Sequence, residues 1–137
     1  MNRPFAVYKA ISFEYGILRI FGMSEKIIVY QKPTCSKCRA TLTLLNESGE
    51  EFEAINYYET LLTAEKLKEL VGKLGVTLQD IVRKDESVAQ DLDVMSMSDD
   101  ELAGTMVKNP DLIQRPIVVR GDKAVLCRPP ENVHALL

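Results

Sequence analysis

The chain has no tryptophan, a single histidine and only three cysteines among its 137 residues. Three cysteines cannot form the fully paired framework that stabilises many small secreted domains, and a chain of this length buries a core without disulfides or metal. The net charge of −3 provides no overall basic surface, so we expect no direct binding to nucleic acid. With 46% apolar and 27% charged residues, the composition is typical of one globular domain.

Residues 1–22 differ in character from the polar, periodic chain that begins at Met23. Lys9, Glu14 and Arg19 interrupt the apolar stretches of this segment, and no small-residue cleavage site precedes Met23, which argues against a signal peptide and a membrane span. Two interpretations remain open. The segment is either an accessory piece that packs on the domain or upstream sequence included by a misplaced start codon, and we favour the second.

Two of the cysteines occur in the sequence Cys35-Ser36-Lys37-Cys38-Arg39, which follows an apolar run and opens a leucine-rich helical pattern. The free N–H groups and positive dipole end of a helix stabilise a thiolate at such a junction, and Lys37 and Arg39 add positive charge. Cys38 lies one turn further along and is placed to close a disulfide with Cys35. The sequence therefore predicts redox or nucleophilic chemistry here, in the reducing environment of the cytoplasm.

A pair of small buried hydrophobic residues or half of a zinc site would also explain Cys35 and Cys38. A zinc site needs two further ligands, and the chain offers only Cys127 and His134, which do not form a second paired motif. We therefore expect no metal. We expect Cys127 to belong to the core and His134 to have a packing or surface role. The sequence contains no cofactor-binding motif, so we expect no bound cofactor.

The hydrophobic pattern predicts an α/β thioredoxin-like fold in a single domain, 23–137. The expected order is a β-α-β unit, a helical insertion at about 60–110, a β-hairpin and a C-terminal helix, with a mixed four-stranded sheet. The expected strands are 27–30, 52–57, 116–119 and 123–127; the first helix is 36–46, with its end at 48–49; the helix caps are Thr63, Thr77 and Ser98; the hairpin turn is 121–122; and the last helix follows Pro129-Pro130. Pro116 occupies the position at which thioredoxin-like folds carry a cis-proline facing the reactive cysteine, so we predict a cis bond there.

Three arginines lie at element boundaries, where neither helical nor strand periodicity explains them: Arg83, Arg115 and Arg128. The planar guanidinium group suits bidentate recognition of a tetrahedral oxyanion such as phosphate, sulfate or arsenate. Each of them, taken alone, is more often a solvated surface residue. Taken together with Cys35, they predict a local anion site.

Four segments in this order resemble the glutaredoxin-dependent arsenate reductases, which belong to the broader superfamily of arsenate reductases and Spx-type regulators. They are Tyr30-Gln31-Lys32-Pro33-Thr34-Cys35, Val82-Arg83-Lys84, Asn109-Pro110 with Gln114-Arg115-Pro116-Ile117-Val118-Val119, and Leu126-Cys127-Arg128-Pro129. The resemblance covers about residues 26–137. It implies that Cys35 attacks arsenate, that Arg83, Arg115 and Arg128 hold the oxyanion, and that glutathione acts as co-substrate, leaving a mixed disulfide that glutaredoxin reduces.

In the same interpretation, Arg39 faces the pocket from position i+4 and stabilises the Cys35 thiolate. Cys38 is the resolving thiol for the adduct or mixed disulfide, which would allow thioredoxin to serve in place of glutaredoxin. The chain departs from the best-known reductases at Gln31, where they carry histidine. We expect a cytoplasmic monomer whose partners are arsenate and glutaredoxin or thioredoxin.

Two other functions remain open. Spx-type regulators use Cys-x-x-Cys as a redox switch while binding RNA polymerase, but they lack the segment 126–129 that this chain has. A general thiol-disulfide oxidoreductase would use Cys35 and Cys38, but it would leave the three arginines unexplained.

Overall fold

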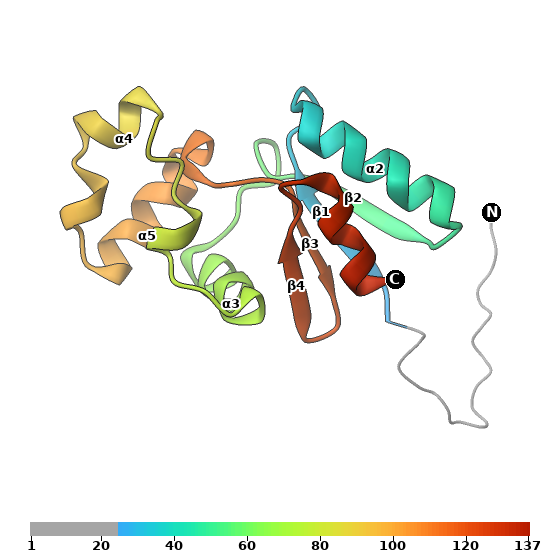
Figure 1. The fold of residues 1–137 in the computed structure, drawn as a ribbon. Helices are drawn as coiled ribbons and strands as arrows, with labels where there is room; N and C mark the ends of the chain where they lie inside the picture. Colours follow the sequence, from blue (N-terminus) through green and yellow to red (C-terminus); the bar gives the residue numbers. More distant parts are fainter. Residues whose placement is uncertain (1–24) are drawn as a thin grey trace.

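The computed structural model describes residues 25–137, so the segment 1–22 and its two interpretations lie outside the described residues. Four strands form one mixed sheet in the order β2-β1-β3-β4 (Figure 1). The strands are β1 (Ile27–Gln31), β2 (Phe52–Asn56), β3 (Ile117–Arg120) and β4 (Lys123–Leu126). β1 pairs in parallel with β2 and antiparallel with β3, and β3 pairs antiparallel with β4. The predicted four-stranded mixed sheet is therefore confirmed.

Helices cover both faces of this sheet (Figure 1). α2 (Ser36–Ser48) and the 3₁₀ helix η5 (Pro130–Leu136) lie on one face, and α3 (Ala64–Leu74) lies on the other, with α5 (Asp99–Lys108) packed against α3. The core accordingly has two parts. The part beneath α2 and η5 consists of Ile27, Val29, Leu45, Val118, Cys127, Val133 and Leu136. The larger part lies among β1, β3 and the helices of the other face.

Most of the middle of the chain is helical, in agreement with the predicted insertion. Between α3 and β3 lie η2 (Gln79–Ile81), α4 (Ser87–Asp91), η3 (Val94–Ser96), α5 and η4 (Pro110–Leu112). Two of the three predicted caps form: Thr63 accepts the Lys66 N–H, and Ser98 forms a complete capping box with Glu101. The third, Thr77, is not the N-cap, because η2 is capped by Leu78. Thr77 and Asp80 bond each other reciprocally at the start of η2.

The second and fourth strands each end one residue earlier than expected. The second strand ends at Asn56, not Tyr57, because the Asn56 carbonyl accepts the N–H groups of Glu59 and Thr60 and begins a turn. The fourth strand ends at Leu126, although the next N–H, that of Cys127, still donates to the Pro116 carbonyl at 3.0 Å.

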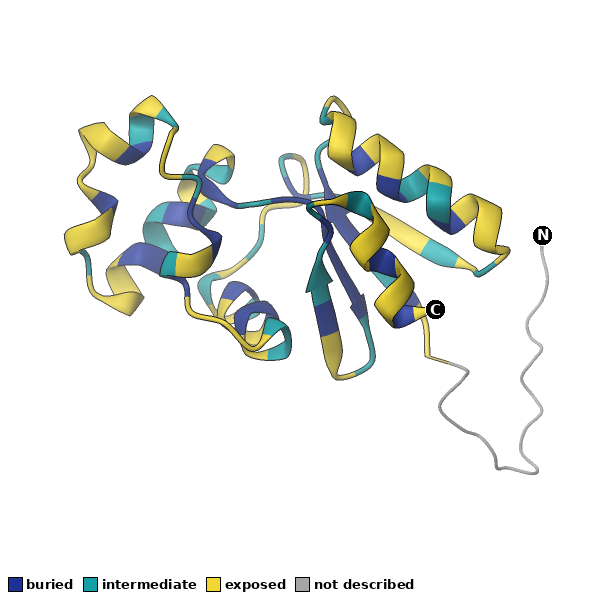
Figure 2. Ribbon diagram, in the orientation of Figure 1, coloured by how far each residue is buried: buried dark blue, intermediate teal, exposed yellow. Residues whose placement is uncertain are grey.

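The carboxyl ends of β1 and β2, the start of α2 and the segment that enters β3 meet at one edge of the sheet. Figure 2 shows this entering segment as buried, and it contains the Arg115–Pro116 peptide bond, which is cis as expected. The Arg128–Pro129 bond, about which the sequence analysis made no prediction, is also cis. Among the described residues, no helix has both the length and the apolar character needed to cross a membrane.

Candidate active site

Cys35 is the N-cap residue of α2 and stands in the short loop that follows β1. Its N–H donates to the Lys32 carbonyl and its carbonyl accepts the Arg39 N–H, each at 3.0 Å, so both neighbouring turns hold its backbone. The residue is partly exposed and its thiol is free. This position combines a fixed backbone with access to solvent, as a nucleophile requires.

The surroundings of Cys35 favour the thiolate. Partial burial raises the pKa of the Cys35 thiol, but this effect is outweighed by hydrogen bonds from the Cys38 N–H, the Cys38 thiol, the Lys37 N–H and the Arg115 side chain, so the pKa falls below its ordinary value. Two of these donors are the free N–H groups at the start of α2, which agrees with the expectation from the sequence. Cys35 therefore carries more thiolate at neutral pH than an ordinary cysteine.

Cys38 differs sharply from Cys35. It is fully buried, and the Lys32 N–H donates to its sulfur at 3.5 Å. Burial and, to a lesser extent, the adjacent Cys35 raise the pKa of Cys38 to about 12 against the opposing effects of the Lys32 N–H and Arg115. At neutral pH the pair therefore consists of a thiolate-prone Cys35 and a protonated Cys38 that donates a hydrogen bond to it.

Arg115 is the most deeply buried of the predicted anion-binding arginines, with 7% of its surface exposed. Its Nη1 donates to the Ile113 carbonyl at 3.4 Å, whereas its Nε is buried without a hydrogen-bond partner. Arg128 lies next to it, because Arg128 Nη1 donates to the Arg115 carbonyl at 3.1 Å. The structure thus brings Arg115 to Cys35 and Arg128 to Arg115.

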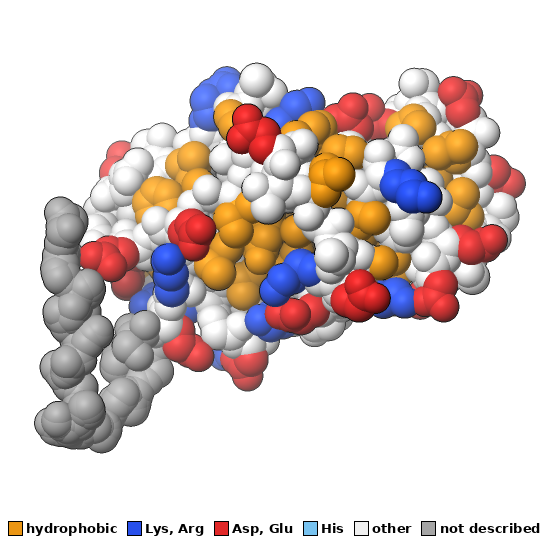
Figure 3. All heavy atoms as spheres, turned by 180° about the vertical axis from the view of Figure 1, so that it is seen from behind, with side chains coloured by type: hydrophobic (Ala, Val, Ile, Leu, Met, Phe, Trp, Pro, Cys, Tyr) orange, Lys and Arg blue, Asp and Glu red, His pale blue; other side chains and the backbone are white. Residues whose placement is uncertain are grey.

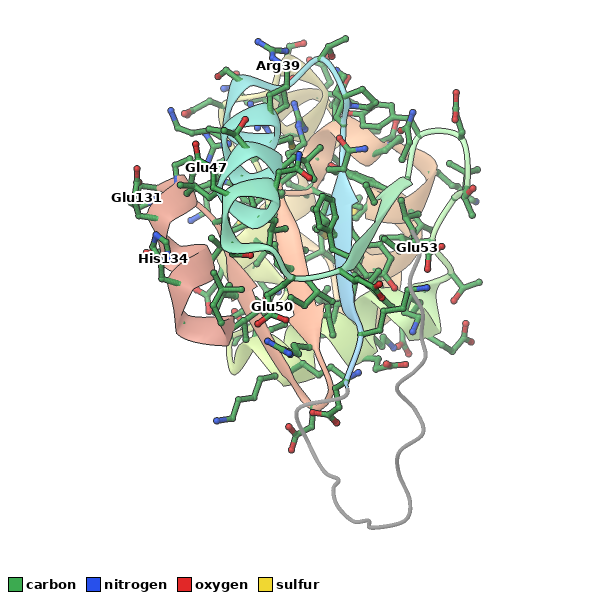
Figure 4. The ribbon with its side chains drawn as sticks, turned by 90° about the vertical axis from the view of Figure 1, so that its right-hand side faces the viewer. Arg39, Glu47, Glu50, Glu53, Glu131 and His134 are labelled. Atoms are coloured by element: carbon green, nitrogen blue, oxygen red, sulfur yellow. The ribbon has the colours of Figure 1, made fainter. Side chains whose placement is uncertain are left out.

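Arg83 and Arg39 are placed less directly. The Arg83 Nε pairs with Glu86 at 3.3 Å, and its backbone N–H donates to the Leu112 carbonyl at 2.7 Å. Arg39 lies at the N-terminal end of α2, where its side chain is exposed (Figure 4), and its Nη1 donates to the Pro33 carbonyl at 3.5 Å. It is therefore linked to the loop before Cys35.

Tyr57 connects Arg83 electrostatically with the rest of the site. Burial raises the pKa of the Tyr57 hydroxyl to about 12, and the positive charges of Arg115 and, more weakly, Arg83 oppose this shift. The hydroxyl donates to the Ile113 carbonyl at 3.2 Å, the same oxygen that Arg115 uses. The alternating pattern predicts that Tyr57 belongs to a strand, and nothing in the sequence pattern indicates a role for it in the site.

A second group lies around Lys32, whose charge is an expected support of the Cys35 thiolate, and it includes Tyr58 and Asp111, to which the sequence pattern assigns no role. The Lys32 Nζ pairs with Asp111 at 3.4 Å and lies 4.7 Å from the centre of the Tyr58 ring, and the Tyr58 hydroxyl donates to the same Asp111 carboxylate. One signal in the sequence could have located Tyr58: it follows β2 at the edge where the carboxyl ends of two parallel strands meet.

The two remaining candidates, Cys127 and His134, do not line the sheet edge at which Cys35 stands. Cys127 is fully buried, and burial raises the pKa of its thiol to about 12, in agreement with the expected core position. His134 is exposed on η5, away from the end of α2 that Arg39 marks (Figure 4). Basic and acidic side chains are interspersed on the face drawn in Figure 3.

Comparison with known proteins identifies the family. The sequence model of the ArsC family matches residues 30–136, which include the cysteine loop and all three boundary arginines. The chain belongs to the ArsC family. Its relatives in this family include the uncharacterized protein YfgD of Escherichia coli strain K12, which is 40% identical over 114 residues, covering 81% of this chain and 96% of YfgD.

Two further ArsC relatives carry an assigned activity in their names. The arsenate reductase of Yersinia enterocolitica is 38% identical over 115 residues, covering 82% of each chain. The solved structure of the arsenate reductase from Vibrio cholerae superposes with a TM-score of 0.79 at 38% identity, covering 82% of this chain and 98% of that one. The α/β fold of the chain is therefore that of solved arsenate reductases.

Proposed function

We propose that the protein is an arsenate reductase that converts arsenate to arsenite, with Cys35 as the nucleophile and glutathione as the thiol co-substrate. One observation carries the proposal: a partly exposed cysteine of lowered pKa lies against Arg115, whose buried Nε has no partner among the described residues. A thiolate and an arsenate anion repel each other, and a guanidinium group placed between them offsets that repulsion. Membership of the ArsC family and the names of its relatives support the same activity.

In the first step, the Cys35 sulfur attacks arsenic. An S–As bond forms and an As–O bond breaks, and the departing oxygen takes up protons and leaves as water. In this proposal, Arg115 and the adjacent Arg128 offset the charge on the remaining oxygens, and Arg83 turns from Glu86 toward the same anion. Arsenic remains As(V) in this adduct.

In the second step, a thiolate of glutathione attacks the Cys35 sulfur. An S–S bond forms and the S–As bond breaks, and its electron pair stays on arsenic, which is reduced to As(III) and released as arsenite. Glutaredoxin then reduces the mixed disulfide on Cys35 by thiol-disulfide exchange. The choice of glutathione and glutaredoxin comes from the family resemblance.

Cys38 is the internal alternative to glutathione, because its attack on Cys35 would leave a Cys35–Cys38 disulfide for thioredoxin to reduce. Its burial and its pKa of about 12 leave almost no thiolate at neutral pH, which favours the external thiol. We therefore assign Cys38 mainly to stabilising the Cys35 thiolate. We further propose that the protein works as a monomer in the cytoplasm, whose reducing environment keeps a reactive thiol available.

The test is arsenate turnover by the purified protein, coupled once to glutathione with glutaredoxin and once to thioredoxin with its reductase. We expect turnover with glutathione, its abolition in Cys35→Ser, and its retention in Cys38→Ser. Cys127→Ala serves as the matched control, since it removes a thiol from the core and leaves the loop intact. Absence of turnover in both systems would contradict the proposal and favour the Spx-like regulator, and loss of all turnover in Cys38→Ser would assign the resolving role to Cys38.

A further inference from the structure

Gln31 is buried at the end of β1, with 6% of its surface exposed. Its side-chain oxygen Oε1 is inaccessible to water and accepts no hydrogen bond. A buried carbonyl oxygen without a donor costs free energy, so a protein rarely keeps one without a reason. Among the described residues, only one other buried side-chain nitrogen or oxygen atom lacks a partner, and that is Arg115 Nε.

Both unpartnered atoms belong to residues at the edge of the sheet where Cys35 stands. Side chains alternate along a strand, so Gln31 shares the face of Ile27 and Val29, which form the core beneath α2. The next residue, Lys32, donates its N–H to the sulfur of Cys38. This contact places the end of β1 directly beneath the first turn of α2.

The strand pairing brings the arginine segment to the same place. Tyr30 pairs with Ile117, so Gln31 lies beside Pro116, the residue that follows Arg115. The Pro116 carbonyl accepts the Cys127 N–H, and this bond holds Arg128, the residue after Cys127, close to Pro116. A buried acceptor and a buried donor, both unused, therefore come from neighbouring positions next to the reactive loop.

A carbonyl oxygen only accepts hydrogen bonds, and it repels a fully deprotonated oxyanion oxygen. Arsenate at neutral pH retains at least one As–OH group, which donates, together with deprotonated oxygens, which accept. Sulfate at the same pH has no proton to donate. A site with one acceptor and one donor therefore matches arsenate and phosphate. With sulfate, the acceptor would face an oxygen that carries no proton and would be repelled by it.

We propose that Gln31 Oε1 accepts a hydrogen bond from the protonated oxygen of the bound oxyanion, while Arg115 Nε donates to a deprotonated one. Gln31 is thus a specificity-determining residue that selects protonated tetrahedral oxyanions over sulfate. This inference rests on the proposed function, because it concerns the anion held at Cys35.

The test measures anion binding in the absence of chemistry. Cys35→Ser protein is titrated calorimetrically with sodium arsenate, sodium phosphate and sodium sulfate at neutral pH and constant ionic strength. We expect arsenate and phosphate to bind about tenfold more tightly than sulfate, since sulfate both loses this hydrogen bond and leaves a buried acceptor unsatisfied, which costs about 1–3 kcal/mol. Adding Gln31→Met, which keeps the length of the side chain and removes its oxygen, should bring the arsenate-to-sulfate ratio close to one.

Two controls make the result specific. Gln90→Met in the same Cys35→Ser background replaces an exposed glutamine on α4 and should leave the ratio unchanged. Gln31→Asn keeps the amide but withdraws its oxygen by one carbon, and it should lower the ratio as Gln31→Met does. An unchanged ratio in the Gln31 variants would overturn the inference while the proposed function stands. Absence of binding by all three anions would count against the proposed function and against this inference with it.

Discussion

Replacement of Arg115 by methionine tests the electrostatic support of the Cys35 thiolate. The Arg115 side chain lowers the pKa of Cys35 and is itself buried. Methionine keeps much of the volume of the side chain and removes its charge. The Ile113 carbonyl, to which Arg115 donates, still accepts the Tyr57 hydroxyl at 3.2 Å, so the change leaves no new unsatisfied carbonyl there.

The magnitude follows from the contact. Arg115 is one of several groups that lower the pKa of Cys35, and the hydrogen bonds from the Lys37 N–H, the Cys38 N–H and the Cys38 thiol remain in Arg115→Met. Cys35 is partly exposed, so water screens the interaction, and a charge pair at such a site contributes about 0.2–1 kcal/mol. The pKa of Cys35 should therefore rise in Arg115→Met by only part of the total lowering.

The assay is the rate of alkylation of Cys35 by iodoacetamide as a function of pH, with the modified residue located by mass spectrometry. The midpoint should move to higher pH in Arg115→Met, and the rate at pH 7 should fall by about two- to fivefold, because a partly exposed charge pair contributes about 0.2–1 kcal/mol. Arg115→Lys keeps the positive charge and should move it by less than half as much. Circular dichroism confirms that both variants fold. A midpoint in Arg115→Met equal to that of the parent would refute the electrostatic role of Arg115.

Two further predictions concern stability. Ser98→Ala removes the capping box with Glu101 and should lower the free energy of unfolding by about 1 kcal/mol in urea denaturation, whereas Ser87→Ala, at a helix start without a side-chain cap bond, should change it little. Burial raises the pKa of Cys127 from 9.0 to about 12, so the unfolded chain ionises first, and the stability that this thiol contributes below about pH 9 is lost as the pH rises toward 12. Cys127→Ala should therefore flatten the fall in melting temperature over this range, and an equally steep fall in the variant would contradict the assignment.

The parts of the fold that depend on local chemistry could be predicted from the sequence. Ser98 and Glu101 form a capping box through their own spacing, and Gly49 ends α2 in the left-handed conformation with φ 78°. The end of β2 could not be predicted in this way. Tyr57 continues the alternating pattern, but the turn that starts at Asn56 and the contact with Ile113 decide its conformation, and Ile113 is 56 residues away.

The same distinction holds for the candidate site. Cys35 could be identified because a strand, a loop and a helix start are consecutive in sequence. The group of Lys32, Tyr58 and Asp111 could not, because Asp111 lies 79 residues from Lys32 and 53 from Tyr58. The burial of Gln31 could not be predicted from the sequence either, because it depends on α2 covering the end of β1. The individual roles of the arginines came from the family resemblance, and those roles remain predictions.

A crystal of the protein soaked with arsenate tests the central claim most directly, because anomalous scattering locates arsenic without ambiguity. We predict arsenic at the Cys35 sulfur, with its oxygens within hydrogen-bond distance of the Arg115 and Arg128 guanidinium groups and Arg83 turned toward the same anion. Arsenic bound at Cys38 or Cys127, or arsenic at Cys35 with none of the three arginines in contact, would contradict the account.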